Sequence, residues 1–234
     1  YDRGRGSVLS DKINTNRFNI NDDEVTFENA WGIADDDIYN KVLKVADEKY
    51  KSKQPFFAFV MSTSNHKPYT YQDGKIDIPS GTGRPGAVKY ADYAIGDLIA
   101  KAKTKPWFNN TVFVFIADHC ASSAGKDAID VKNHHIPAFI YNLKSHANEN
   151  VSKEVSQIDI FPTLFSLFNW KYTSQFYGKD IFDPQYQSRS FVGTYIKLGM
   201  KKGEDVSILS DQKKINQYKW IDKNLIDTKI DPIF

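Results

Sequence analysis

The dipeptide Asp118-His119 directly follows an apolar run, residues 111–117, whose length and composition predict a buried β-strand. A carboxylate next to a neutral imidazole is a suitable ligand pair for a divalent ion such as Zn²⁺ or Mn²⁺. Two adjacent ligands cannot fill a coordination sphere, so at least two more must come from elsewhere. The spacing leaves an alternative open, in which Asp118 caps the following loop and His119 lies on the surface.

His66 follows a second apolar run, residues 55–60, which also predicts a strand covered on both faces. The carboxyl ends of parallel strands lie at the same edge of a sheet, where α/β domains place their chemistry. We therefore expect His66, Asp118 and His119 to converge on one candidate site in a cleft.

Other polar and aromatic residues are weaker candidates. Lys126, in a Gly-Lys loop, could face an anionic substrate, although such loops are also common without a function. His134 and His135 could be ligands or a solvated pair ahead of a proline. Trp31, just before a predicted helix, could pack in the core or hold a glycerol or sugar unit at the edge of a cleft.

Cys120 is the only cysteine, which excludes an internal disulfide and a multi-thiolate zinc site. It could be a nucleophile, or a small and partly buried residue beside a site. Pairing with His119 is geometrically poor, because adjacent residues of an extended chain point to opposite sides.

The elements around these residues predict an α/β domain with a mainly parallel sheet flanked by helices. Apolar residues at helical spacing predict helices over 36–50 and 87–103, and a further strand is expected at 136–141. The Ser-, Gly- and Pro-containing residues 62–86 predict a long loop, which is usually functional in a compact domain.

The C-terminal part has a different pattern. Asp159 is expected to cap a helix that carries Pro162 in its first turn. Beyond it, short alternating stretches between residues 190 and 220, separated by glycines and polar turns, predict a small antiparallel β meander.

Composition limits the function classes. The 234 residues, 41% hydrophobic and 14% aromatic, can build a sizeable core. A net charge of +2 gives no electrostatic case for nucleic acid binding. The sequence contains neither an apolar run of 18 residues nor a recognisable signal peptide. Because it begins with Tyr1, we expect it to be a piece of a longer protein.

Several stretches, in this order, resemble the sulfatase-like proteins of the alkaline phosphatase superfamily. The similarity is greatest to the lipoteichoic acid synthase-like phosphoglycerol transferases and related bacterial sulfatases, and it covers nearly the whole chain. The stretches that carry it are ENAWGIADDDIY, FFAFVMSTSNHKPY, VKYADYAIGDLI, NTVFVFIADHCASSAGK, HHIPAFIYNL, QIDIFPTLFSLF and FVGTYIKLGMKKGEDVSILSD.

The resemblance implies roles for individual residues. Asp118 and His119 match the metal pair of the family, which implies one divalent ion, Mn²⁺ or Zn²⁺ rather than Mg²⁺ or Ca²⁺. His66 matches the histidine that contacts the phosphate or sulfate group. Trp31 is similar to a tryptophan that lines the glycerol-phosphate site, although the arginine expected after it is absent. Lys126 and His135 are weaker matches for substrate contacts.

The resemblance also implies what lies outside this sequence. The family's acidic metal ligand and its Thr, Ser or modified Cys nucleophile would precede Tyr1, as would membrane-anchoring helices. We therefore expect residues 1–188 to be the C-terminal part of an alkaline phosphatase-like catalytic domain and 189–234 to be a small β subdomain packed on it. Alone, the fragment is expected to be inactive.

For the complete protein, the resemblance implies a hydrolase or phosphoglycerol transferase at the outer face of the cytoplasmic membrane. Its substrate would be an anionic phosphate or sulfate ester, linked to a lipid or glycan, and its partner the missing N-terminal half. The alternative is an inactive superfamily member that binds a ligand without turnover. A hydroxyl or cysteine nucleophile upstream of Tyr1 would distinguish the enzyme from the binding module.

Overall fold

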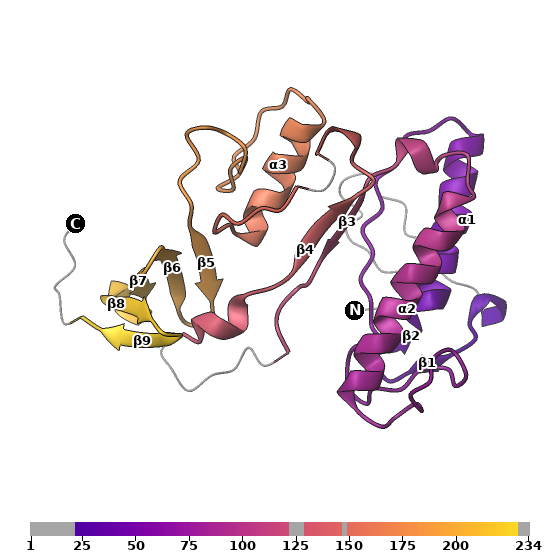
Figure 1. Ribbon diagram of the computed structural model, residues 1–234, viewed down its shortest axis with the longest axis horizontal. Coiled ribbons are helices and arrows are strands. Elements are labelled where there is room, and N and C mark those ends of the chain that lie inside the picture. The colour runs from indigo at the N-terminus through magenta and orange to yellow at the C-terminus, as the bar shows by residue number, and fades with distance from the viewer. Residues whose placement is uncertain (1–21, 122–128, 147–148, 229–234) are drawn as a thin grey trace. The chain divides into compact units, whose positions relative to one another are not determined.

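The computed structural model describes residues 22–121, 129–146 and 149–228 (Figure 1). The chain forms two compact units, residues 1–111 and 112–234. Each is described by itself below. The domain boundary expected at residues 188/189 stays a prediction. No helix in the described ranges is long and apolar enough to cross a bilayer.

The first unit is built on two helices that pack against each other, α1 (Asp35–Lys51) and α2 (Arg84–Lys103). Both were expected from their apolar spacing, and the long loop expected between residues 62 and 86 ends where α2 begins. A short antiparallel hairpin, β1 (Glu28–Asn29) and β2 (Gly32–Ile33), precedes α1. On each helix, buried residues recur three, four or seven positions apart, which is the spacing of an amphipathic helix. These residues are Leu43, Ala46, Ala87, Ala94, Leu98 and Ala102.

The acidic residues 35–37 at the start of α1 are buried rather than solvent-exposed. The N-cap position is occupied by Ala34. The Asp36 carboxylate accepts a hydrogen bond from the Tyr90 hydroxyl at 2.5 Å and pairs with Lys75 at 3.0 Å. The Asp37 carboxylate accepts one from the backbone N–H of Thr26 at 2.7 Å. These carboxylates therefore fasten α1 to the surrounding chain.

Residues 55–60 form no strand, so the prediction of a buried strand at this place is wrong. The Phe57 side chain is 75% exposed. A strand needs a neighbour to share its backbone hydrogen bonds. Within the described part of this unit, β1 and β2 pair only with each other and leave the segment without such a neighbour.

In the second unit, β3 (Phe113–Ile116) and β4 (Ala138–Tyr141) lie where strands were predicted. They pair antiparallel, with Phe113 opposite Tyr141, whereas a parallel arrangement was expected. A parallel pair needs a crossover, usually a helix, between its strands. The described part of the connection holds only the 3₁₀ turn Val131–His134, which favours a direct reversal of the chain.

The predicted meander is present as a five-stranded antiparallel sheet, whose fifth strand lies beyond residue 220. Side chains of its strands, Val192, Val206 and Ile208, are buried on one face. They pack there against Ile129 and Val131, which lie between β3 and β4. The strands follow one another in sequence order: β5 (Ser190–Gly193), β6 (Leu198–Lys202), β7 (Asp205–Leu209), β8 (Ile215–Ile221) and β9 (Asn224–Asp227).

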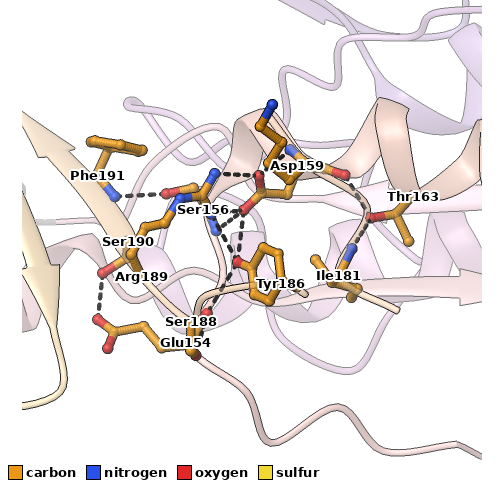
Figure 2. Close-up of polar contacts among 11 residues, drawn as sticks. Glu154, Ser156, Asp159, Thr163, Ile181, Tyr186, Ser188, Arg189, Ser190 and Phe191 are labelled. Atoms are coloured by element: carbon orange, nitrogen blue, oxygen red, sulfur yellow. Dashed lines mark hydrogen bonds and ion pairs between the residues drawn. The ribbon is translucent and has the colours of Figure 1, made fainter. Parts of the chain in front are cut away.

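Asp159 precedes α3 (Ile160–Leu167), as predicted, but its carboxylate does not cap that helix. Figure 2 shows it at the centre of a polar network. The Arg189 guanidinium donates to both carboxylate oxygens, at 2.7 and 2.9 Å. The backbone N–H groups of Ser156 and Lys179 donate at 2.9 and 2.8 Å. The network therefore ties the start of α3 to the chain that leads into β5.

Candidate functional site

Trp31 and His66 lie against each other in the first unit. Their ring centroids are 3.4 Å apart and their planes are tilted by 38°. His66 is exposed and Trp31 half-buried, so the imidazole covers part of the indole while remaining accessible. The His66 Nδ1 atom lies 3.3 Å from the carbonyl oxygen of Lys67. Two residues that the sequence suggested separately for substrate contact are thus one unit of structure.

The loops that carry this pair are tied together by Asn29. Its side-chain amide donates to the carbonyl oxygen and the hydroxyl of Thr70, at 3.3 and 3.1 Å. Its side-chain oxygen accepts the backbone N–H of Trp31 at 2.8 Å. One amide therefore fixes the backbone beside Trp31 and the loop that follows His66.

Asp118 and His119 lie just beyond the end of β3 in the second unit. Both side chains are largely exposed, 81% for Asp118 and 64% for His119. The His119 Nδ1 atom lies 2.7 Å from the carbonyl oxygen of Cys120, and its Nε2 atom lies 3.3 Å from Asp118 Oδ2. The other carboxylate oxygen of Asp118 accepts the backbone N–H of His119 at 2.8 Å. The carboxylate thus anchors the turn and also faces the imidazole.

The donor chemistry of this pair fits a divalent ion. A ring that donates from Nδ1 to a backbone carbonyl presents the lone pair of Nε2, as metal-bound histidines typically do. Within the described ranges, no third His, Cys, Asp or Glu joins the pair in a ligand-like group. Asp118 and His119 therefore stay a predicted pair of metal ligands.

Cys120 and His135 are linked through the backbone. The thiol of Cys120 lies 3.1 Å from the carbonyl oxygen of His135, while the His135 residue is exposed. The His119 ring contacts the carbonyl of Cys120. This geometry favours the structural interpretation of Cys120 over a Cys-His nucleophile. It leaves the imidazole of His135 as a predicted substrate contact.

His134 and Lys126 complete the predicted set. The two ring nitrogens of His134 lie 2.6 Å from the carbonyl oxygen of Asp130 and 3.1 Å from that of Gly193, so His134 links the 3₁₀ turn to β5. Lys126 lies outside the described residues. The convergence of His66 with Asp118 and His119 at one edge stays a prediction, since the two units are described separately.

The sequence patterns did not reveal the residues that support Trp31 and His66. Asn29 and Ser64 belong to no motif, and Asp35 signalled only the acidic start of a helix. Their contacts join segments far apart in the chain. The run of Ser, Thr and Asn at residues 62–65, just before His66, was the one available signal.

The comparisons with known proteins identify the family of the chain. The sulfatase family model matches residues 3–170. The phosphoglycerol transferase I of Citrobacter koseri is 32% identical over 106 residues, and that of Escherichia fergusonii 31% over 102 residues. Each match covers 41% of this chain and 13% of the relative. The chain therefore spans only a small part of the curated relatives it matches.

Solved structures extend the similarity. A Vibrio parahaemolyticus protein of the alkaline phosphatase superfamily is 31% identical with a TM-score of 0.80, over 88% of this chain and 52% of that one. The lipoteichoic acid synthase LtaP of Listeria monocytogenes shares the fold at 23% identity and a TM-score of 0.59, over 86% of this chain and 56% of that one. These neighbours confirm the alkaline phosphatase-like α/β class with its C-terminal antiparallel meander. With a family model that matches most of its length, the chain belongs to the sulfatase family.

Proposed function

We propose that this chain is part of a metal-dependent enzyme of the sulfatase type, a phosphoryl or sulfuryl ester hydrolase or a phosphoglycerol transferase. The reaction proceeds through a covalent intermediate on a nucleophile upstream of Tyr1. The substrate is an anionic phosphate or sulfate ester carried on a lipid or glycan. The enzyme works at the outer face of the cytoplasmic membrane, anchored by N-terminal helices, and the N-terminal half completes its active site.

The observation that carries this proposal is that the His119 imidazole and the Asp118 carboxylate face each other. With Nδ1 donating to the Cys120 carbonyl, Nε2 turns its lone pair toward a carboxylate oxygen only 3.3 Å away. A nitrogen and an oxygen at that distance can bind one divalent ion together. A nitrogen and oxygen donor set suits Mn²⁺ or Zn²⁺. Asp118 and His119 would hold such an ion, which would supply a lowered pKa for a bound nucleophile and neutralise charge on the oxygens of the transferred group.

His66 and Trp31 form the substrate side of the proposal. His66 is exposed on the indole of Trp31, where its imidazole donates a hydrogen bond to a non-bridging oxygen or to the leaving group. The indole offers an apolar surface of the kind that packs against a glycerol or sugar unit. Lys126 and His135 are proposed to add contacts to the anionic group.

A binding module without turnover is the second candidate. It is favoured by the two-ligand pair, since no third metal-ligating side chain accompanies Asp118 and His119 within the described ranges. In that case the half-buried Trp31 ring and the exposed His66 ring hold a glycan or anionic ligand and no bond is broken.

The decisive experiment uses the full-length gene product, its metal content measured by elemental analysis and its activity on sulfate monoesters, phosphate monoesters and phosphoglycerol donors. We expect about one divalent ion per chain. Asp118→Ala should lose both the metal and the activity. His66→Gln should keep the metal and lower kcat by roughly 10²- to 10⁴-fold, the usual contribution of a positioned acid–base group.

Asp211→Ala is the matched control, because Asp211 is an exposed aspartate of the same unit as Asp118. It should leave metal content and turnover unchanged. A full-length protein that binds no metal and turns over none of these substrates, yet retains an anionic glycan through Trp31, would overturn the enzyme and establish the binding module.

A further inference from the structure

The contact between Trp31 and His66 depends on the relative position of two loops, because each ring comes from a different segment of the chain. We propose that Asp35, acting with Ser64, is a positioning residue that holds His66 on the indole of Trp31. This inference deepens the proposed function and rests on it for its catalytic meaning. Its structural content can be tested independently of turnover.

Asp35 and Ser64 are joined by reciprocal hydrogen bonds. The Oδ1 atom of Asp35 accepts the backbone N–H of Ser64 at 3.0 Å and that of Thr63 at 2.7 Å. In return, the Ser64 hydroxyl oxygen accepts the backbone N–H of Asp35 at 3.0 Å. The Thr63 hydroxyl adds a bond to the carbonyl oxygen of Ile33 at 2.6 Å. Four hydrogen bonds thus join the segment after Trp31 to the segment before His66.

The burial of Asp35 shows why this position needs a carbonyl-type oxygen. Asp35 is 0% exposed and Ser64 3% exposed. A buried backbone N–H without an acceptor is unfavourable. An apolar side chain at position 35 would leave the N–H groups of Thr63 and Ser64 in that state, so the two segments would move apart to reach water.

The second oxygen of Asp35 argues against a role in stability alone. Oδ2 is buried and has no hydrogen-bond partner in the described part of the chain. Burial of a carboxylate oxygen without a partner is unfavourable. Asp35 therefore joins the two segments at the expense of some folding free energy. Such a loss is expected where the segments must hold reacting groups in place.

A second tether lies on the other side of the ring pair. Asn29 precedes Trp31 and bonds Thr70, which follows His66. Asp35 follows Trp31 and bonds Ser64, which precedes His66. The two rings are thus held between tethers at both ends of each segment. Loss of the Asp35 tether should leave His66 hinged at the Thr70 side and free to leave the indole.

The test observes the His66 ring directly by proton NMR of this chain in D₂O. The sequence has five histidines, so the few carbon-bound ring protons can be assigned by the loss of signals in His66→Gln. Because the imidazole lies over the indole, ring current should shift the His66 signals upfield. The variants are Asp35→Ala, Asp35→Asn and Ser64→Ala, each checked for the native fold by circular dichroism.

We expect Asp35→Ala to lose the upfield shift and Ser64→Ala to reduce it. Asp35→Asn should keep it, because the amide oxygen can accept the same two N–H groups. Asp47→Ala is the matched control. Asp47 is also on α1 and accepts bonds from Lys105 and Trp107, far along the helix from position 35. It should leave the His66 signals unchanged.

Folded Asp35→Ala and Ser64→Ala proteins that both keep the wild-type shift would overturn the proposal, as would an Asp35→Asn protein that loses it. If Asp35→Ala does not fold, the Ser64→Ala result decides alone. Failure of the proposed function gives a different result: the shift follows Asp35 and Ser64 as expected, but His66→Gln leaves turnover of the full-length enzyme unaltered.

Discussion

Two aspartates lie at the start of a helix and are almost completely buried, but their carboxylates differ in how many hydrogen bonds they accept. Asp159, before α3, has both carboxylate oxygens bonded to the Arg189 guanidinium and receives two backbone N–H groups besides. Asp35, at the start of α1, uses one oxygen for two backbone N–H groups and leaves the other without a partner. One carboxylate is compensated and the other is not.

The pKa values of the two carboxyl groups differ accordingly. Burial is the largest influence on both and acts upward. In Asp35 it prevails over the hydrogen bonds from Thr63 and Ser64, so the pKa is raised. In Asp159 the hydrogen bonds from Arg189 and from the backbone of Lys179 and Ser156 prevail over burial, so the pKa is lowered. We infer that Asp159 serves stability, whereas Asp35 serves position.

Removal of the Arg189 guanidinium should have the largest effect. Arg189→Met leaves Asp159 as a buried charge without its ionic partner, which costs about 3–5 kcal/mol of the free energy of unfolding. Urea denaturation measures this loss. The double variant Arg189→Met, Asp159→Asn should recover part of it, because the uncompensated charge is gone. If the single variant loses less than about 1 kcal/mol, the ion pair does not stabilise this region.

A methyl group at Gly178 should have the next largest effect, because this glycine precedes the N–H group that Lys179 donates to Asp159. A Cβ atom there would lie 1.9 Å from the carbonyl oxygen of Ile158, so the backbone must shift. We expect Gly178→Ala to lower the free energy of unfolding by about 1–3 kcal/mol, as overpacking does.

Gly96→Ala is the control for that substitution. Gly96 lies within α2, and a Cβ atom there meets nothing within 4 Å. Alanine should therefore raise stability by roughly 0.5–1 kcal/mol through its better helix propensity. If denaturation shows that both substitutions change the free energy of unfolding in the same direction, the close approach at Gly178 is not a constraint in solution.

The smallest effect is expected in the pH dependence of stability. The raised pKa of Asp35 means that the folded state binds more protons than the unfolded state just above about pH 3.9, where a free aspartate titrates. Stability through this group should therefore rise as the pH falls toward 3.9. The lowered pKa of Asp159 acts at lower pH, where its stabilisation is lost as the pH falls below about 3.9.

Urea denaturation at a series of pH values separates these contributions. Asp35→Asn should remove the gain on acidification toward pH 3.9 and leave the loss at lower pH. An Asp35→Asn profile parallel to that of the unaltered chain across the whole series would show that Asp35 does not titrate with a raised pKa.

Local patterns predicted much of the fold. The apolar spacing located α1, α2 and α3 within a few residues, and alternation located the meander, because both depend on which face of an element is buried. The strand expected at residues 55–60 is absent for a non-local reason: an apolar run forms a strand only where another strand pairs with it, and none does so within the described part of its unit. Whether β3 and β4 pair parallel or antiparallel depends on the connection between them, so the sequence of neither strand predicts it.

The candidate site was predictable only in part. The type and position of His66, Asp118 and His119 signalled chemistry, and the resemblance to a family gave them roles. The tilted ring contact between Trp31 and His66, and the tethers at Asp35 and Asn29, follow from the meeting of distant loops. No spacing rule connects such residues, because their separation in sequence is set by the loops between them.

The contact between Tyr90 and Asp36 has an optical consequence. Burial and the neighbouring carboxylates raise the pKa of the Tyr90 phenol, and burial with the charge of Asp35 raises that of Tyr39. In an alkaline titration followed by the ultraviolet absorbance of tyrosinate, these two buried phenols should therefore ionise late. The late absorbance step then belongs to phenols released when the packing around α1 and α2 opens, so the chain carries its own chromophore for that event.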